Sequence, residues 1–246
     1  MDDPRLDSAQ VHVWTASLSA GREALGYYLT LLADDERMRA ERFRLPKIRE
    51  RFIVARATLR RLLSVYLRTD PWLLRIGYSA QEKPYLASCP ELCFNLSHAE
   101  DTALYTVASR RDVGIDIERI THRVEMEGVA RHAFSTSEYD ALTALTPEAR
   151  TSAFFHCWTR KEAYVKAHGN GLGYPTRSFS VSLLPGDDDA LLADEREANA
   201  LLNWRLIEIN APNGFCAALA AAGRDWSVLR FDTQTLPPLP NAERRC

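Results

Sequence analysis

Apolar and polar residues alternate along the chain in two ways, and these predict helices interspersed with short strands. Long segments repeat apolar residues every three or four positions, whereas short runs are rich in β-branched and aromatic residues. The predicted helices span residues 34–43, 47–67, 135–145 and 147–168. The predicted strands span residues 11–14, 74–78, 92–96, 103–109, 113–117, 179–183, 204–209, 215–219 and 226–231.

Local signals fix several ends of these elements. Ser135-x-x-Glu138 is a capping box, and Gly169 follows the last residue of the second long helix. The order strand, helices, strands, then helices and strands again predicts an α+β protein with two similar halves. We expect an N-terminal half over 1–111, a C-terminal half over 112–235 and a loose tail over 236–246, which contains three prolines.

Composition adds the class of protein. Of the 246 residues, 46% are hydrophobic and 26% charged, as in soluble globular domains. The longest apolar run, 215–222, is too short to cross a membrane, and the acidic N-terminus does not resemble a signal peptide. Five scattered cysteines lack the paired spacing of a zinc site, so we expect reduced thiols and a cytoplasmic location.

Net charge is distributed unevenly along the chain. Residues 37–61 contain ten Lys or Arg and two Glu, a net charge of +8, so the rest of the chain carries −10 although the total is only −2. In the helix over 47–67 the arginines fall largely off the apolar stripe. For Arg39 and Arg51 the simplest interpretation is a solvated helix face. A basic surface for a phosphorylated ligand or an acidic partner is the alternative.

Two carboxylates alternate with apolar residues on one predicted strand. In Gly114-Ile115-Asp116-Ile117-Glu118 the isoleucines are expected to face a core, and Asp116 and Glu118 share the other face. Adjacent carboxylates repel each other unless a cation or proton lies between them, and hard oxygen ligands favour Mg²⁺ or Ca²⁺. Taken alone, the stretch also fits an ordinary strand with a polar outer face.

The second long helix offers a third carboxylate. Trp158, Glu162 and Lys166 are four residues apart and therefore share one helix face. A solvent-exposed Glu–Lys pair is the simpler interpretation, but a large aromatic residue on the same face favours an interior or a cleft. If this face meets Asp116 and Glu118, three carboxylates and one ammonium group come together.

Four motifs, taken in order, resemble the 4′-phosphopantetheinyl transferases, in their larger two-halved, Sfp-like branch. They are Lys83-Pro84-Tyr85, Phe94-Asn95-Leu96-Ser97-His98, Gly114-Ile115-Asp116-Ile117-Glu118, and Trp158-x-x-Lys161-Glu162-x-x-x-Lys166 followed by Gly169-x-Gly171. The resemblance covers about residues 34–184. Glu82 is a departure, because the family commonly has glycine before the lysine.

The resemblance implies a fold, a reaction and its partners. Two α+β halves related by a pseudo-twofold axis enclose a coenzyme A site, and the chain is expected to be a cytoplasmic monomer. A serine of an apo acyl or peptidyl carrier protein attacks the β-phosphate of coenzyme A. The phosphopantetheine arm is transferred, adenosine 3′,5′-bisphosphate leaves, and neither nucleic acid nor membrane takes part.

The resemblance also implies roles for individual residues. Asp116, Glu118 and Glu162 hold Mg²⁺, or Mn²⁺ in its place, and Lys166 holds the pyrophosphate. Glu162, or a metal-bound water that it orients, takes the serine proton, and both routes stay open. The residues implied in coenzyme A binding are Arg39, Arg51, Lys83, Ser97, His98 and Lys166. Which phosphate His98 contacts is left open.

Two other functions compete with this one. A Mg²⁺-dependent nuclease or phosphohydrolase also uses carboxylates and a lysine, with residues 37–61 following a phosphate backbone. It does not account for the Asn95-Leu96-Ser97-His98 stretch or the Trp158 motif. A catalytically idle module that only binds carrier proteins would be expected to lack Asp116 or Glu162, and both are present.

Overall fold

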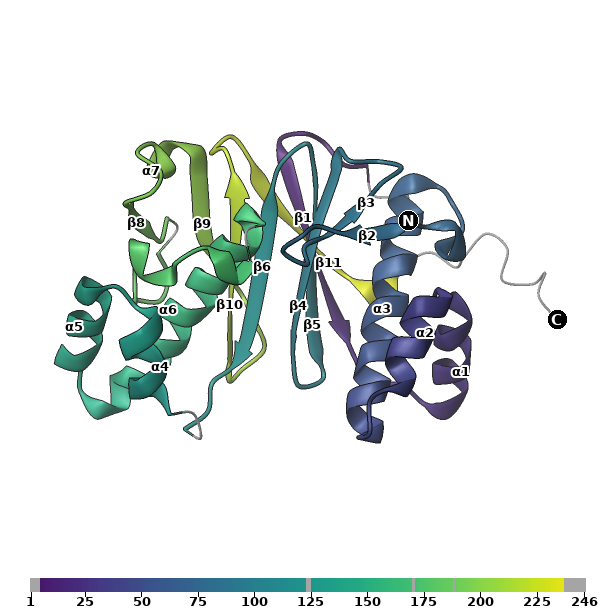
Figure 1. Ribbon diagram of the computed structural model, residues 1–246, viewed down its shortest axis with the longest axis horizontal. Coiled ribbons are helices and arrows are strands. Elements are labelled where there is room, and N and C mark those ends of the chain that lie inside the picture. The colour runs from purple at the N-terminus through teal and green to yellow at the C-terminus, as the bar shows by residue number, and fades with distance from the viewer. Residues whose placement is uncertain (1–4, 123–124, 170, 188, 237–246) are drawn as a thin grey trace.

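Two β-sheets form the centre of the molecule, and a long helix covers the outer face of each (Figure 1). The computed structural model describes residues 5–122, 125–169, 171–187 and 189–236. The first sheet has the strand order β11-β1-β5-β4 and the second β6-β10-β9. Two antiparallel pairs, β2-β3 and β7-β8, lie apart from these sheets.

Most elements of the first sheet and its helices come from the N-terminal half of the sequence. In chain order they are β1 (Gln10–Ser17), α1 (Arg22–Leu31), α2 (Asp34–Glu41), α3 (Pro46–Leu67), β2 (Ile76–Tyr78), β3 (Pro84–Leu86), β4 (Leu92–Ala99) and β5 (Thr102–Ser109). The remaining elements are β6 (Val113–Arg119), α4 (Met126–Ala133), α5 (Thr136–Ala144), α6 (Pro147–His168), β7 (Phe179–Val181), β8 (Leu191–Asp194), α7 (Ala200–Asn203), β9 (Trp204–Ile209), β10 (Phe215–Ala222) and β11 (Ser227–Asp232).

The two parts of the chain repeat one arrangement, which confirms the predicted α+β fold with two similar halves. Each part runs through a strand, two short helices, a 22-residue helix, an antiparallel pair and two further strands. The order β1-β5-β4 in one sheet therefore corresponds to β6-β10-β9 in the other. Both long helices begin with a proline and end at a residue with positive φ, Arg68 or Gly169.

The inner faces of the two sheets share one apolar core. Val11 and Leu104 of the first sheet belong to the same buried cluster as Ile115, Ile117 and Leu219 of the second. Separate cores lie under α3 and under α6. Burial of this inner core joins the halves, because apolar surface of each sheet is removed from water only by the other.

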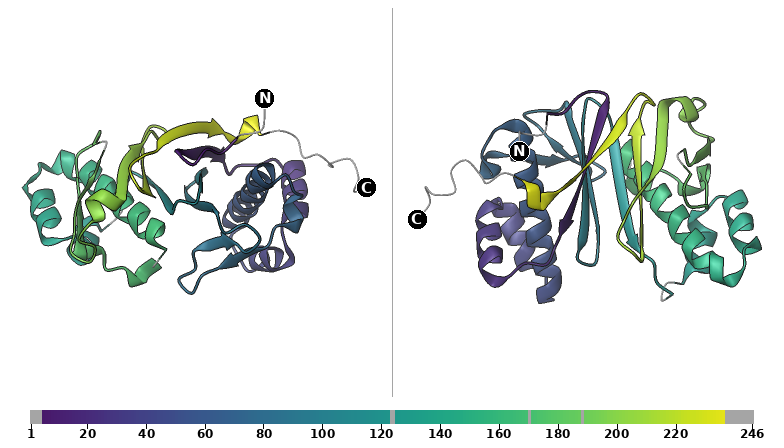
Figure 2. Two further views of the ribbon diagram at one scale, coloured as in Figure 1. Left: turned by 90° about the horizontal axis from the view of Figure 1, so that it is seen from above. Right: turned by 180° about the vertical axis from the view of Figure 1, so that it is seen from behind.

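The last strand breaks the symmetry. β11 follows the second half in sequence but pairs in parallel with β1 of the first sheet, as Figure 2 shows. Phe231 of β11 stacks on Trp14 of β1, with 4.5 Å between ring centroids. One strand of the predicted 112–235 half thus belongs to the N-terminal sheet, and the boundaries of the two halves stay a prediction.

A buried glutamate holds α2 against α3. Glu36 accepts hydrogen bonds from Arg56 Nη2 at 2.6 Å and Arg60 Nε at 2.5 Å, and Arg60 also donates to the Pro71 and Leu74 carbonyl oxygens. Arg56 and Arg60 are 7% and 2% exposed. These two arginines of the basic segment are therefore neutralised inside the protein rather than exposed to a ligand.

The second half repeats this ion pair at the equivalent place. Glu138 closes the capping box of α5 and lies 2.8 Å from Lys161 Nζ on α6. Lys161 donates to the carbonyl oxygens of Thr176 and Phe179, just as Arg60 donates to the segment that follows α3. Removal of one partner from such a buried pair costs about 3–5 kcal/mol, so both pairs hold the short helices firmly in place.

Several elements differ from the sequence prediction. Helices α1 and α4 were not expected, and in α1 only Leu31 is buried, so its apolar pattern is weak. The strands β3 and β8 were not expected either. Apart from Leu236, the expected tail lies outside the described residues. Among the described helices, none combines the length and apolar character needed to cross a membrane.

Helix α6 lies directly on β6 at Gly114. A Cβ atom at this position would overlap the Ala163 carbonyl oxygen and the Ala167 nitrogen, both backbone atoms. We expect Gly114→Ala to lower the free energy of unfolding by about 3 kcal/mol, because neither backbone can move aside cheaply. Chemical denaturation measures the change.

Gly26 in α1 is the matched control, since an added Cβ would meet no atom within 4 Å. Gly26→Ala should leave the stability unchanged or raise it by up to about 1 kcal/mol through helix propensity. Equal effects of the two substitutions would contradict the proposed close contact.

Buried His12 predicts a loss of stability in mild acid. Its Nδ1 lies 2.6 Å from the Tyr66 hydroxyl, and burial lowers its pKa to about 4. Between these two pKa values His12 is protonated in the unfolded chain but not in the folded protein. The free energy of unfolding therefore falls as the pH drops from about 6.5 towards 4. Between pH 7 and pH 5 we expect His12 to account for about 2 kcal/mol, measured by urea unfolding. In His12→Gln this share of the drop should vanish, and an unchanged drop would refute the assignment.

Candidate active site

Asp116 joins the two halves at one carboxylate oxygen. Its Oδ1 accepts from Lys166 Nζ of α6 at 2.5 Å and from the Ser97 hydroxyl of β4 at 2.8 Å. Asp116 is 3% exposed, and Ile115 and Ile117 lie in the inner core as the strand alternation predicted. The other oxygen, Oδ2, is buried without a hydrogen-bond partner among the described residues.

Two more carboxylates lie in the electrostatic field of Asp116. Glu118 accepts from the Trp158 indole Nε1 at 3.3 Å, and its pKa is raised first by burial and then by the charge of Asp116. The pKa of Glu162 is also raised, mainly by burial and further by Asp116, while Lys166 opposes the shift. The three carboxylates therefore repel one another, and a bound cation would relieve this electrostatic repulsion.

Two cations, Arg51 and Lys166, and the imidazole of His98 lie near this group on three different elements. Desolvation, then Lys166 and then Arg51 lower the pKa of His98 at the end of β4. Lys166 Nζ of α6 lies 3.2 Å from the hydroxyl of Ser97, the neighbour of His98 on β4, and Arg51 of α3 binds Asp101 in the turn that follows β4, so the three side chains belong to one region. Such a convergence of positive groups is suited to an anion with several phosphates.

A cavity of about 1170 Å³ has Lys166 in its wall. Trp158, Glu162 and Lys166 line it from α6, which confirms that they share a helix face, and Gln81 and Glu82 line it from the turn between β2 and β3. The walls thus come from both halves of the chain. The volume is sufficient for a ligand larger than most drug-sized molecules.

Two of the predicted binding residues have other partners. Lys83 Nζ donates to the Ala167 carbonyl oxygen at 2.7 Å and pairs with Asp112 at 3.2 Å, so it holds the β2–β3 pair against the end of α6. Arg39 lies over the Phe52 ring, 5.5 Å from its centroid, and has no contact with the carboxylate group among the described residues. The structure therefore groups Arg51, Ser97, His98 and Lys166, but not Arg39.

The departure at Glu82 has a backbone explanation. Glu82 has a φ of 64°, in the left-handed region that favours glycine. The turn that presents Lys83 is thus the same shape as one that a glycine would make, with a conformational cost for the glutamate.

A divalent cation is the group to test against this site. The three carboxylates supply hard oxygen donors, and the buried, unpaired Oδ2 of Asp116 has an open coordination position. Within the described ranges of the chain, no set of three or more His, Cys, Asp or Glu side chains is spaced as a ligand set for a metal ion. The donor chemistry fits Mg²⁺.

Three residues that position the site were not predicted from the sequence. Asn95 Oδ1 accepts from the Ile115 backbone nitrogen at 3.0 Å and so ties β4 to β6. Its signal was a polar residue within the apolar run of a predicted strand. Asp101 binds Arg51, and Asp112 binds Lys83. No local pattern indicates these last two, because each pair joins residues far apart in sequence.

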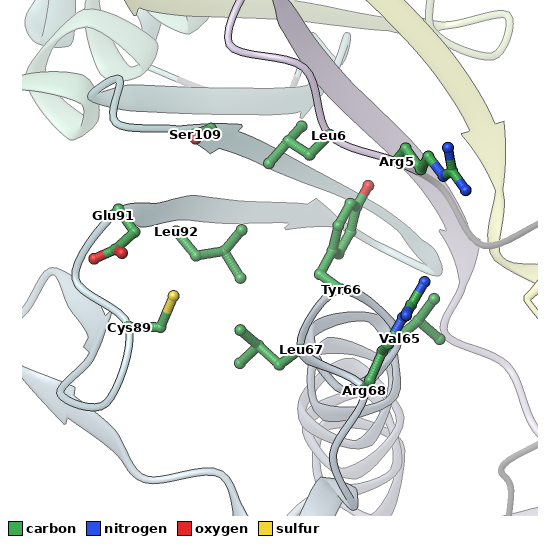
Figure 3. A pocket seen from close by; sticks show the side chains of 10 residues that line it. All are labelled: Arg5, Leu6, Val65, Tyr66, Leu67, Arg68, Cys89, Glu91, Leu92 and Ser109. Carbon is green, nitrogen blue, oxygen red and sulfur yellow. The ribbon is translucent and has the colours of Figure 1, made fainter.

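A second cavity, of about 420 Å³, lies at the C-terminal end of α3 (Figure 3). Leu67 and Leu92 form apolar walls, and the guanidinium groups of Arg5 and Arg68 lie on one side of it. None of the predicted site residues lines this cavity. It is therefore separate from the group around Asp116.

Comparisons with known proteins agree with this arrangement. The family model for the 4′-phosphopantetheinyl transferase superfamily matches residues 112–220, which include β6 and α6. The chain is 34% identical over 222 residues to the 4′-phosphopantetheinyl transferase HetI of Nostoc sp., covering 89% of this chain and 90% of that protein. It is 31% identical over 166 residues to a 4′-phosphopantetheinyl transferase of Bacillus subtilis, covering 68% and 72% of the two chains.

A third relative is the 4′-phosphopantetheinyl transferase Sfp of Bacillus subtilis strain 168, with 30% identity over 156 residues, 63% of this chain and 68% of Sfp. The similarity to HetI extends over nearly the whole of both chains, so it includes both halves and the cavity between them. With its repeated α+β halves and its carboxylate group on β6, the chain belongs to the 4′-phosphopantetheinyl transferase superfamily, in the Sfp-like branch, and is an enzyme of that class.

Proposed function

We propose that this enzyme transfers the phosphopantetheine arm of coenzyme A to a serine of an apo acyl or peptidyl carrier protein. The observation that supports this most is the grouping of three carboxylates with the cations Lys166 and Arg51 and the imidazole of His98, where Glu162 and Lys166 line a cavity formed by both halves. Coenzyme A carries a pyrophosphate and a further phosphate, which match several cations. The cavity leaves room for the pantetheine arm.

The reaction is a displacement at phosphorus. The carrier serine oxygen forms a bond to the β-phosphorus of coenzyme A, and the bond from that phosphorus to the bridging oxygen breaks. Adenosine 3′,5′-bisphosphate leaves with the electron pair. Catalysis of this type depends mainly on positioning and on charge stabilisation.

Each residue has a role that follows from its place. Lys166 and Arg51 hold phosphate oxygens, and Ser97 and His98 lie at the strand end between them. Glu162 lines the cavity, where its carboxylate can accept a proton from a substrate hydroxyl. It takes the proton of the carrier serine, directly or through a water molecule. Mg²⁺, held by Asp116, Glu118 and Glu162, would neutralise charge on the pyrophosphate.

The first prediction from this proposal concerns the transfer itself. The protein is incubated with Mg²⁺, coenzyme A and an apo carrier protein, and the carrier is weighed by mass spectrometry. We expect a gain equal to one phosphopantetheine group, and its loss when the carrier serine is replaced by alanine. Free phosphopantetheine with an unmodified carrier would instead indicate a phosphohydrolase. No modification of several unrelated carriers would refute the proposal.

The second prediction concerns the carboxylates. Asp116→Asn and Glu162→Gln keep the shape of each side chain but remove its charge, and we expect at least a hundredfold loss of kcat/KM, about the size of a general-base contribution. Asp34→Asn is the matched control, since Asp34 is an exposed carboxylate paired with Arg37 at 3.3 Å. It should leave turnover unchanged. Melting curves show whether the variants fold, and near wild-type turnover in either site variant would contradict its role.

A further inference from the structure

Asp101 holds two cations of α3 from the turn between β4 and β5. Its Oδ1 accepts from Arg51 Nε at 2.7 Å, and its Oδ2 lies 3.0 Å from Lys47 Nζ. Lys47 and Arg51 are one helical turn apart, so a single carboxylate spans both. Asp101 follows His98 by three residues, and the clamp therefore links the basic face of α3 to the strand end that contains Ser97 and His98.

Asp101 binds Arg51 in a way that leaves the two Nη nitrogens of the guanidinium group able to bind a ligand. Only Nε is engaged, and in the described part of the chain neither Nη nitrogen takes part in a hydrogen bond or ion pair. The two Nη groups form the fork that binds a phosphate in a bidentate manner. The Arg51 side chain is 23% exposed, so the fork has solvent access.

The turn itself is firmly anchored, which makes Asp101 a fixed point. Its carbonyl oxygen accepts from the Leu18 backbone nitrogen at 2.7 Å, which ties the turn to the end of β1. Glu100 beside it has a φ of 51°, a conformation that few residues other than glycine adopt and that fixes the direction of the chain. A rigid acceptor therefore determines where the flexible arginine side chain points.

The negative charge of Asp101 opposes the binding of a phosphate, and its restraint of Arg51 favours it. Both carboxylate oxygens already pair with cations, and the side chain is 40% exposed, so salt and water screen the remaining charge. The arginine side chain, in contrast, loses rotational freedom about several bonds when it binds a ligand. The restraint is therefore the larger effect.

We propose that Asp101 is a positioning residue that orders Arg51 for a phosphate group of coenzyme A. This rests on the proposed function, because it takes coenzyme A as the ligand of Arg51. Asp101 does not touch the substrate. It lowers the entropy that Arg51 loses on binding, and its effect therefore falls on affinity rather than on the chemical step.

The test compares two substitutions in the transfer assay with a carrier protein. Asp101→Ala removes the acceptor, and we expect KM for coenzyme A to rise about five- to tenfold with kcat within twofold. Asp101→Asn keeps an oxygen that accepts from Arg51 Nε, and its KM should stay within twofold of wild type. In an Arg51→Ala background, adding Asp101→Ala should produce no further rise.

Asp225→Ala is the control, because Asp225 also pairs with an arginine, Arg111 at 3.1 Å, but lies outside the site. It should leave both constants unchanged. An unchanged or lower KM in Asp101→Ala, or an equal effect with and without Arg51, would overturn the proposal. Melting temperatures separate these results from a loss of folding.

A parallel titration distinguishes this proposal from the proposed function. Calorimetry measures Kd for coenzyme A without a carrier, and Asp101→Ala should weaken it by the same factor. If the wild-type protein binds coenzyme A but transfers nothing, the proposed function fails, and the Kd values of the variants still decide the role of Asp101. If the wild-type protein does not bind coenzyme A, both fail.

Discussion

The site depends on how closely α6 lies on β6, which in turn depends on the missing side chain at Gly114. Backbone contact at this glycine lets the helix present Lys166 to Asp116 at hydrogen-bond distance. Asp116 is two residues further along the same face of the strand, and Ser97 reaches it from the other half. One close approach therefore determines where the lysine lies relative to the carboxylate and the serine that binds it. A helix displaced by the thickness of a methyl group would separate Lys166 from Asp116.

The two halves use the same framework for different purposes. By strand register, His12, Trp14 and Ala16 of β1 occupy the positions that Gly114, Asp116 and Glu118 occupy in β6. In the first half this face is filled by rings that pack on Phe231, whereas in the second half it carries the carboxylates. The buried pairs Glu36–Arg60 and Glu138–Lys161 are present in both. Framework contacts are thus duplicated, and the chemistry is present once.

The sequence pattern predicted those features that depend on local spacing. The two 22-residue helices and the shared face of Asp116 and Glu118 follow from periods of 3.6 and 2 residues, which the backbone imposes everywhere. The grouping of Ser97, His98 and Lys166 required a family resemblance. The burial of Arg56 and Arg60 was not predictable, because their partner Glu36 lies on another helix and a charged residue on a helix gives the same local signal whether or not it is paired. The pairing of β11 with β1 joins residues more than two hundred positions apart, and no local pattern encodes it.

The position of β11 also bears on how the chain folds during synthesis. The N-terminal sheet has β1 between β5 and β11, so one edge of β1 stays unpaired until residues 227–232 have left the ribosome. Most of the N-terminal half is then already able to form its helices, hairpins and core, but with an exposed strand edge that is a template for pairing with other chains. Completion of the first sheet is consequently among the last events of folding.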